Sequence, residues 1–486
     1  MRDAKTVAII GAGMAGLAAA RLLCANGMKV RLFESNAKVG GCCASTRLGG
    51  YVFNDGASYL AMPGMLEHLF GRLGLDRTEL LPLRRISSVQ TTRLPDGTSI
   101  TIGDGPDIAV DGTHGAAVGD RLRTELAHFL KEWEPALRFF ADDVLAHPLS
   151  MPHLIAKGWR HLLKLRGTVV SQLNRSFSSE AARAAFAGTL LYSGVPHERM
   201  PAFALLGLVS ILRDGCFLPE GGMGRIPEVL SDAVRAQSGN IHLNANVRRI
   251  LVKSGRAYAI EVENEGVVEI DAIISSVSAM HTYGSLLSAN DVPPCMRRKL
   301  QRVALSRKGF VLQLGLSNRI AARDHANYVL PWMSEQSQLS QPGKNGLRWA
   351  IYMVPTVTLP ELAPPGGSIV EMFPPISQDI APDDWSKARK EEAAAQAIER
   401  LRRDHELEIE VQRILSPREF QNDAHLYAGA LYGLSPAAGV PALFQHRSPI
   451  RGLYQAGQTT WPGFGVVSAG LSGVFAAEAL LHDAVR

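Results

Sequence analysis

Apolar residues in the first part of the chain gather in short runs, and these runs predict strands separated by a helix. Residues 7–10 form one apolar run, residues 17–24 carry a helix-forming apolar pattern, and residues 30–33 form a second run. A buried strand, a helix and a second buried strand in this order are typical of a parallel βαβ unit. The pattern therefore predicts an α/β fold.

The middle of the chain changes from an alternating pattern to a helical one. Residues 85–102 alternate between apolar and polar positions on both sides of a turn at residues 95–97, which predicts paired strands. Residues 120–145 are rich in charge with apolar residues at helical spacing, and helical patterns continue to about residue 212. We expect a helical region here.

The second half of the chain mixes both patterns. We expect a helix over residues 225–237, a strand over 241–243, a hairpin over 249–270, a buried strand at 273–274, strands over 310–316, 347–354 and 368–373, a helix over 385–403 and a last helix over 474–481. The strands between residues 307 and 374 predict a mixed sheet. A chain of 486 residues is too long for one ordinary core, which suggests two interleaved domains.

Three glycines lie in the turn between the first strand and the helix. Gly11, Gly13 and Gly16 match the pattern G-x-G-x-x-G, in which the glycines allow a tight turn, close approach to a pyrophosphate and close helix packing. Glu34 follows the second strand, where its carboxylate can accept both hydroxyls of an adenosine ribose and disfavours a 2′-phosphate. The stretch predicts a dinucleotide site that is not specific for NADP.

Further motifs decide which dinucleotide is expected. They lie at residues 39–41, 51–58, 217–223, 354–356, 363–366, 417–420, 452–458 and 462–470. With these motifs the sequence resembles the phytoene desaturases and carotenoid isomerases, which are flavoproteins of the wider amine oxidase-like superfamily. The resemblance covers nearly the whole chain. It implies FAD as the cofactor and an oxidoreductase that desaturates, or isomerises, a long apolar polyene or isoprenoid.

The resemblance also implies how the chain is divided. We expect a Rossmann-type FAD-binding domain from residues 1–75, 215–285 and 445–486, a mixed-sheet substrate-binding domain from 76–119 and 286–444, and a helical, membrane-facing insertion over 120–214. A helix beginning near Val466 would direct its N–H groups toward the flavin, and Gly465 would let the backbone come close. Gly457 would leave room for the diphosphate.

The predicted contacts follow from these motifs. The residues expected at FAD are Gly11, Ala12, Gly13, Met14, Ala15, Gly16, Glu34, Ser35, Gly41, Cys42, Ser58, Val247, Gly457, Gln458, Gly465, Val466 and Val467. The residues expected at the substrate are Tyr352, Trp461 and Phe464. The sequence singles out no catalytic residue, because His68, His281 and His425 are dispersed and fit no known catalytic order. It predicts no metal site.

The charge and the cysteine content limit which partners and which cellular compartment we expect. The formal charge is +5. The chain has no Lys/Arg run with interleaved aromatic residues, so its sequence does not predict nucleic-acid binding. The mild positive charge fits contact with an anionic lipid surface. The five cysteines lack zinc-site spacing, which favours reduced thiols in a cytoplasmic protein. Cys42 stands where relatives usually carry an arginine or a small residue, so an arginine contact to the cofactor is in doubt at this position.

Residues 152–169 form a basic amphipathic pattern. Apolar residues recur at helical spacing beside Lys157, Arg160, His161, Lys164 and Arg166. Two interpretations are open: the helix lies in a membrane interface, or it packs on the protein with a solvated basic face. The apolar stretches of the chain are too short or too broken to span a bilayer, so we expect peripheral association at most.

The electron acceptor and two other functions stay open. The glycines at residues 221–224 follow Pro219 rather than a buried strand, so we expect no second site for NADH, and oxygen or a quinone would accept electrons. An amine oxidase-like enzyme oxidising a C–N bond would place a lysine and paired aromatics at the flavin, for which Lys308 and Trp461 are candidates. A non-enzymatic prenyl-binding protein would share the fold but would not need the intact glycines.

Overall fold

The computed structural model describes residues 5–112, 115–191, 195, 198–340 and 347–485. Five parallel strands form one sheet, in the order β10 (Asn240–His242), β2 (Lys29–Phe33), β1 (Thr6–Ile10), β14 (Ala272–Ser275) and β20 (Leu453–Gln455). Helix α1 (Met14–Ala25) connects β1 to β2, whereas β14 pairs with the other edge of β1. The strand order therefore reverses at β1, and α/β sheets bind their ligands outside the carboxyl ends of the strands at such a point.

Two glycines bring α1 close to its neighbours. A Cβ atom on Gly16 would lie 1.9 Å from the Gly11 carbonyl oxygen, so the helix could not pack on its preceding turn with any larger residue. A Cβ atom on Gly473 would lie 2.0 Å from the Ala15 carbonyl oxygen, where α1 meets α14 (Val466–Val485). These two contacts fix the helix that begins at the glycine loop.

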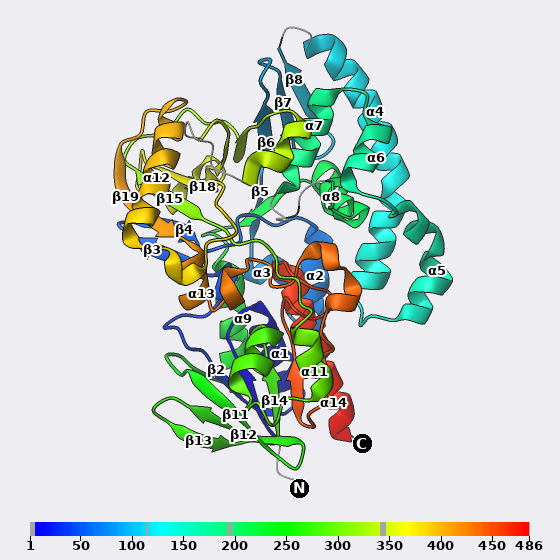
Figure 1. The fold of residues 1–486 in the computed structure, drawn as a ribbon, viewed down its shortest axis with the longest axis vertical. Coiled ribbons are helices and arrows are strands. Elements are labelled where there is room, and N and C mark those ends of the chain that lie inside the picture. The colour runs from blue at the N-terminus through cyan, green and yellow to red at the C-terminus, as the bar shows by residue number, and fades with distance from the viewer. Residues whose placement is uncertain (1–4, 113–114, 192–194, 196–197, 341–346, 486) are drawn as a thin grey trace.

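The second large sheet is mixed. Its eight strands follow the order β19 (Ile409–Leu415), β15 (Val311–Leu316), β18 (Ser368–Met372), β17 (Ala350–Met353), β16 (Ala326–Val329), β6 (Ser88–Arg93), β7 (Ser99–Gly103) and β8 (Ile108–Asp111). Neighbouring strands are antiparallel except β16 and β6, which are parallel. This pair joins strands from two distant parts of the chain. Figure 1 shows this sheet in the upper part of the molecule and the parallel sheet below it.

The helical region packs beside the mixed sheet. It contains α4 (Gly115–Arg138), α5 (Met151–Lys164), α6 (Val169–Ser176), α7 (Glu180–Thr189) and α8 (Leu205–Asp214), and these helices line the right side of Figure 1. A cluster of buried aromatic rings, including Phe129, Trp133 and Phe177, holds α4 against the helices that follow it. Within the described residues, no helix combines the length and the apolar composition needed to cross a bilayer.

Shorter elements connect these three parts. They are β3 (Ser45–Leu48), β4 (Tyr51–Asn54), α2 (Pro63–Arg72), α3 (Arg77–Leu80), β5 (Leu83–Arg85), β9 (Phe217–Pro219), α9 (Arg225–Arg235), β11 (Val247–Lys253), β12 (Arg256–Val262), β13 (Gly266–Glu269), α10 (Ala279–His281), α11 (Pro294–Leu300), α12 (Lys387–Arg402) and α13 (Pro417–Asn422). Strands β11 to β13 form a separate antiparallel sheet at the lower end of the molecule, near both chain ends (Figure 1).

The predicted fold class is confirmed: a Rossmann-type parallel sheet is interleaved with a mixed sheet and a helical region. Some local expectations were wrong. The expected hairpin over residues 249–270 is a three-stranded sheet, because a second turn at residues 263–265, with Asn264 at φ +65°, returns the chain for β13. A short strand, β9, does precede Gly221, but it pairs antiparallel with β5 and lies outside the parallel sheet.

Candidate functional site

A cavity of about 490 Å³ lies at the carboxyl ends of the parallel strands. The residues that follow β1, β2, β14 and β20 form one side of it. The other side comes from the mixed sheet and from the segments around residues 373–378 and 420–432. The cavity therefore lies at the position where the strand order reverses.

The glycine loop forms the narrowest part of this wall. Gly11 has φ +94°, a conformation that favours glycine, and a Cβ atom there would lie 2.8 Å from the Ser276 hydroxyl oxygen. Gly13 precedes α1, and a Cβ atom on it would meet no atom within 4 Å, so its backbone faces open space. No acidic residue lies in the first turn of α1. The helix start can therefore receive an anion through its free N–H groups.

Glu34 is held rigidly at the edge of the cavity. Its side chain is buried, Oε2 accepts a hydrogen bond from the Ala12 N–H at 2.7 Å, and Oε1 accepts one from the Asn36 N–H at 2.9 Å. The Ser35 hydroxyl donates a third bond to Oε1 at 3.2 Å. Charge-assisted hydrogen bonds of this kind orient the carboxylate. The lone pairs that these bonds do not use can accept hydrogen bonds from a ligand.

The C-terminal glycines form the opposite end of the same wall. Gly457 (φ +98°) would place a Cβ atom 2.9 Å from the Ser276 carbonyl oxygen, and its N–H donates to the Ser472 hydroxyl. Gly465 (φ +109°) directly precedes α14, which carries no acidic residue in its first turn. The start of α14 therefore presents a second set of free N–H groups to the cavity.

The structure brings most of the predicted cofactor residues to one cavity. Its lining includes Gly11, Gly13, Met14, Ala15, Glu34, Ser35, Gly41, Cys42, Ser58, Val247, Gly457, Gln458, Gly465 and Val466. Ala12, Gly16 and Val467 are absent from the lining. Ala12 instead orients Glu34 through its N–H, and Gly16 packs α1 on the strand. Val467 is buried in the core.

Two of the three predicted substrate residues lie elsewhere. Tyr352 is on the far face of β17, packed in another core cluster, with its hydroxyl 2.7 Å from His405 Nε2. Because side chains alternate along a strand, it is the neighbouring Ile351 that lines the cavity. Trp461 is turned toward the helical region and donates from Nε1 to the His147 carbonyl oxygen at 2.8 Å. Tyr352 and Trp461, which the sequence predicted as substrate contacts, are therefore absent from the lining of this cavity.

An apolar wall faces the glycine loops. Phe464 lines it as expected, and Tyr432, which the sequence did not single out, packs against Phe464 with ring centroids 4.8 Å apart. The other apolar residues of this wall are Trp349, Ile351, Phe373, Pro374, Pro375, Ile376, Phe420, Leu426 and Leu431. They follow Gly11 and Glu34 of the opposite wall by more than about 300 positions in the chain, so no local pattern could assign them to this cavity.

Several other lining residues carry polar side chains. Arg307 and Lys308 line the cavity, and partial burial lowers the pKa of both side chains. Lys308 Nζ donates to the Ile380 carbonyl oxygen at 2.7 Å. His281 and His425 also line it, and burial together with the nearby His425 lowers the pKa of His281. Of the histidines weighed earlier, His68 lies outside this lining and contacts the Ala146 carbonyl oxygen.

The thiols at the cavity are protonated. Burial, with a smaller contribution from Asp55, raises the pKa of Cys42 to about 11, and burial raises the pKa of Cys43 well above its usual range. Both cysteines line the cavity, and all five cysteines are free. A protonated thiol is a weak nucleophile, so the Cys42–Cys43 pair is poorly suited to redox chemistry.

Comparison with known proteins identifies what this arrangement resembles. The family model of flavin-containing amine oxidoreductases matches residues 14–481. The chain is 25% identical to a zeta-carotene-forming phytoene desaturase of Myxococcus xanthus, over 98% of this chain and 94% of the relative. It is 26% identical to a phytoene dehydrogenase of Streptomyces griseus, over 97% and 94%. A 4,4′-diapophytoene desaturase of Staphylococcus aureus is 24% identical over 99% of both chains.

Solved structures share the fold at low sequence identity. An oxidoreductase from Methanosarcina mazei superposes with a TM-score of 0.66 at 17% identity, covering 97% of this chain and all of that one. A putrescine oxidase bound to putrescine superposes with a TM-score of 0.63 at 18% identity, covering 98% and 99%. At these identities the likeness extends to the fold alone.

Proposed function

The chain belongs to the family of flavin-containing amine oxidoreductases, and we propose that it desaturates, or isomerises, a long apolar polyene or isoprenoid. The observation that carries this proposal is the cavity itself. One side combines two glycine loops, two helix starts and Glu34, whereas the other side is built from apolar and aromatic residues. The desaturase relatives, which match over nearly the whole chain, support the same substrate class.

FAD is the cofactor of this family, and the residues of the cavity fit it. The open space at Gly13 gives room for a diphosphate beside the start of α1, and Glu34 offers carboxylate oxygens for ribose hydroxyls. We place the isoalloxazine ring near Gly465 and Val466, where the start of α14 favours negative charge. Bound FAD supplies the two-electron acceptor that removal of hydrogen from a carbon chain needs.

The residues of the chain contribute mainly positioning in this proposal. The apolar wall excludes water and holds a hydrocarbon chain by its surface, since such a chain offers almost no polar group for orientation. Tyr432 and Phe464 form a ring pair against which conjugated double bonds can pack. No side chain is assigned as a base.

Oxidation of an amine is the main alternative function. Lys308 lines the cavity, and Tyr432 and Phe464 supply an aromatic pair there, as an amine oxidase would require. However, Glu34 is the one carboxylate among the described lining residues, and its oxygens already accept bonds from the backbone and Ser35. With Arg307 and Lys308 in the same wall, the cavity disfavours a protonated amine.

A non-enzymatic prenyl-binding function is a second alternative, and the complete glycine set argues against it. A protein without a cofactor would not need glycines with positive φ or with so little space for a Cβ atom, as found at Gly11, Gly457 and Gly465. For an enzyme of this class the electrons would pass to oxygen or a quinone. The segment before Gly221 supports the absence of an NADH site, because β9 lies outside the parallel sheet.

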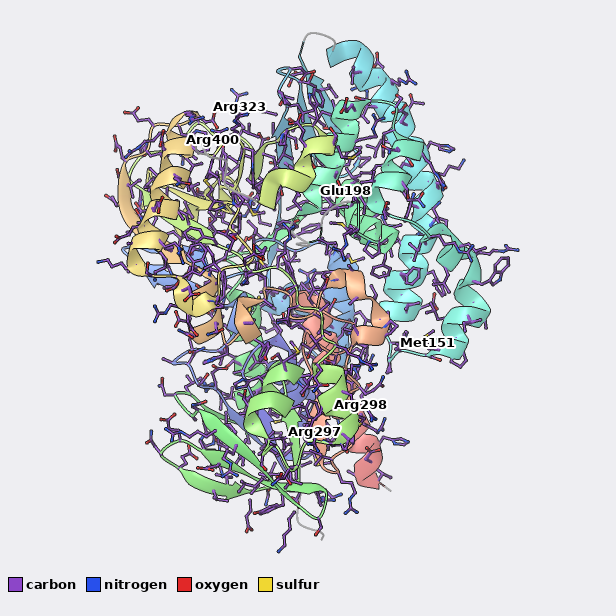
Figure 2. The ribbon with its side chains drawn as sticks, viewed as in Figure 1. Met151, Glu198, Arg297, Arg298, Arg323 and Arg400 are labelled. Atoms are coloured by element: carbon purple, nitrogen blue, oxygen red, sulfur yellow. The ribbon has the colours of Figure 1, made fainter. Side chains whose placement is uncertain are left out.

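We also propose peripheral contact with a membrane through α5. Its inner face packs Leu154 and Gly158 against the helical region, whereas Met151, Ile155, Trp159 and Leu163 are 46–59% exposed. These four residues are spaced four apart, so they form one apolar stripe along the outer face of the helix. Figure 2 labels Met151 at the lower end of this helix, on the right side of the molecule.

The reaction is tested by anaerobic mixing of the yellow holoprotein with phytoene and related polyenes. A desaturase should lose the oxidised flavin bands and form a product two hydrogens lighter per step. NADH and NADPH should leave the bands unchanged over the same time. Fast bleaching by NADH would contradict the proposed acceptors.

Two results of the same experiment would replace the proposal. A product of unchanged mass, formed only after chemical reduction of the cofactor, identifies an isomerase. Bleaching by putrescine or simple monoamines but not by polyenes identifies an amine oxidase. A protein that takes up FAD but responds to none of these compounds contradicts all the enzymatic assignments.

A further inference from the structure

A short segment from the substrate side reaches over the glycine-loop side of the cavity. Residues 423–425, which we call the strap, follow α13 directly, and Ala424 and His425 line the cavity. His425 is also exposed to solvent, so it lies at the mouth of the cavity and not deep inside. The strap is thus the outer cover of the part of the cavity that contains Glu34 and Ser35.

The strap is anchored at both ends, and Ala424 in its centre also packs against the apolar cluster that anchors it. Phe420 and Leu426 are buried together in a small apolar cluster, and the Leu426 N–H donates to the Phe420 carbonyl oxygen at 2.9 Å. Lys390 Nζ holds α13 through Glu419 Oε1 at 2.6 Å. Between these anchors, His425 adopts φ +52°, a left-handed conformation that is uncommon for a residue other than glycine.

Two hydrogen bonds join the strap to the loop after β2. Ser35 Oγ lies 2.7 Å from His425 Nε2, and Asn36 Nδ2 donates to the Asp423 carbonyl oxygen at 3.0 Å. Both bonds connect residues almost 390 positions apart in the chain. They are solvent-exposed, so each contributes little on its own and can break locally without unfolding of the anchors.

The first of these bonds is directly connected to Glu34. The Ser35 hydroxyl that contacts His425 is also within 3.2 Å of Glu34 Oε1. Across the cavity, His281 is close enough to His425 for the two imidazoles to influence each other electrostatically. On one side the strap is therefore linked through Ser35 to the carboxylate assigned to the ribose, and on the other side it faces α10.

We propose that the strap closes the cavity over the adenosine half of FAD, and that the Ser35–His425 contact must open before FAD enters or leaves. This inference rests on the cofactor placement proposed above. It makes His425 a positioning residue for FAD retention. It also gives Ser35 a role in closing the site besides its contact with Glu34.

The experiment measures FAD exchange without any substrate. The holoprotein is mixed with an excess of radiolabelled FAD and the bound label is followed with time, and binding of FAD to the deflavinated full chain is followed by quenching of FAD fluorescence. The variants are His425→Ala and Ser35→Ala. His128→Ala is the matched control, because His128 is an exposed histidine on α4 that does not line the cavity.

Loss of one hydrogen bond from the closed state should accelerate exchange by up to about tenfold in both strap variants. Association of FAD should accelerate as well. The dissociation constant should then change less than either rate constant, because a gate slows both entry and exit. Loss of a simple contact would change the dissociation rate alone. Circular dichroism melts check that the variants are folded. His128→Ala should exchange at the wild-type rate.

Each other outcome has a defined meaning. If both strap variants exchange FAD at the rate of the His128→Ala control, the proposal that the strap closes the site is overturned. Faster dissociation with unchanged association also overturns it, because a closed strap would slow entry too. If the wild-type chain takes up no FAD at all, the cofactor placement fails, and that result is distinct from failure of the strap.

Discussion

Glu34 connects the sequence motif to the cavity through its two oxygens. One oxygen accepts from the Ala12 N–H inside the glycine loop, and the other accepts from the Asn36 N–H in the loop after β2. The carboxylate therefore ties together two loops that must both be in place for a dinucleotide to bind. Its loss would loosen both loops and would also remove the contacts that we propose for the ribose.

The first prediction is that Glu34→Ala weakens FAD binding by about 1.5 to 3 kcal/mol, or about ten- to a hundredfold, because charge-assisted hydrogen bonds are lost. FAD titration followed by fluorescence quenching measures this change. Glu399→Ala, which removes an exposed carboxylate on α12, is the control and should bind FAD like the wild type. Equal affinity in the Glu34 variant would move the ribose contact to another residue.

Glu371 is a buried carboxyl where the mixed sheet meets β4. It lies on β18, accepts from the Asn54 N–H at 3.1 Å and from Gln313 Nε2 at 3.2 Å, and is 2% exposed. Burial raises its pKa from 4.5 to about 7, although the Asn54 bond acts in the opposite direction. The protonated form therefore favours the folded state, and its stabilising contribution is lost as the pH rises from about 4.5 through 7.

The second prediction is that Glu371→Gln gains stability relative to the wild type when the pH is raised from 5 to 8. The neutral amide avoids burial of a charge, and the shift of the pKa sets an upper limit of about 3 kcal/mol on the relative gain. Urea unfolding at both pH values measures it. Glu392→Gln, at an exposed position on α12, should follow the wild type at both pH values. A pH-independent difference would contradict the raised pKa.

Helix α5 has one face that packs on the protein and a second, apolar face that is exposed. Leu154 packs inward, and Gly158 lets Phe139 approach, since a Cβ atom on Gly158 would lie 2.7 Å from that ring. Of the basic residues on this stretch, Lys164 pairs with Glu132 at 2.7 Å and His161 stacks on Phe139. The inner face is therefore packed on the protein, whereas the apolar stripe is left outside.

Basic residues flank this stripe. Lys157, Arg160 and Arg166 are exposed, and the Arg160 guanidinium lies 5.2 Å from the centre of the Trp159 ring. An apolar stripe with flanking positive charge suits an anionic membrane interface.

The third prediction is that the chain cosediments with vesicles containing anionic lipid and that binding falls as salt rises. Neutralising Lys157, Arg160 and Arg166 to Gln should weaken binding by up to about 1 kcal/mol per residue near a charged surface. The control is Arg297→Gln with Arg298→Gln, two exposed arginines on α11 and therefore on a different helix from the apolar stripe (Figure 2). Binding that is equal in both variants, or that ignores salt and lipid charge, would contradict contact through α5.

At the scale of the whole molecule, the cavity exists because the chain crosses between two sheets several times. The parallel sheet takes strands from residues 6–33, 240–275 and 453–455, and the mixed sheet takes strands from the segments between them. Asp55, which follows β4, accepts from Arg413 of β19 at 2.6 Å and from Lys38 at 2.7 Å. Such contacts fix the apolar wall opposite the glycine loops.

The sequence by itself determined the cofactor side of this protein. The strand, glycine turn and helix at residues 7–24 are neighbours in the chain, and only glycine can adopt the conformation of Gly11 at low cost or fit at Gly16. Glu34 follows the next strand at a spacing set by one βαβ unit. Local spacing was sufficient because each of these contacts lies within one supersecondary unit.

The tertiary structure alone decided which residues form the proposed substrate side and the proposed cover of the site. Tyr352 and Ile351 are adjacent apolar residues, and only the placement of β17 in its sheet determines which of them faces the cavity. Tyr432 and His425 reach the site through contacts with residues far away in the chain. No periodicity encodes such contacts, because they depend on how two sheets are positioned against each other and not on the residues around each side chain.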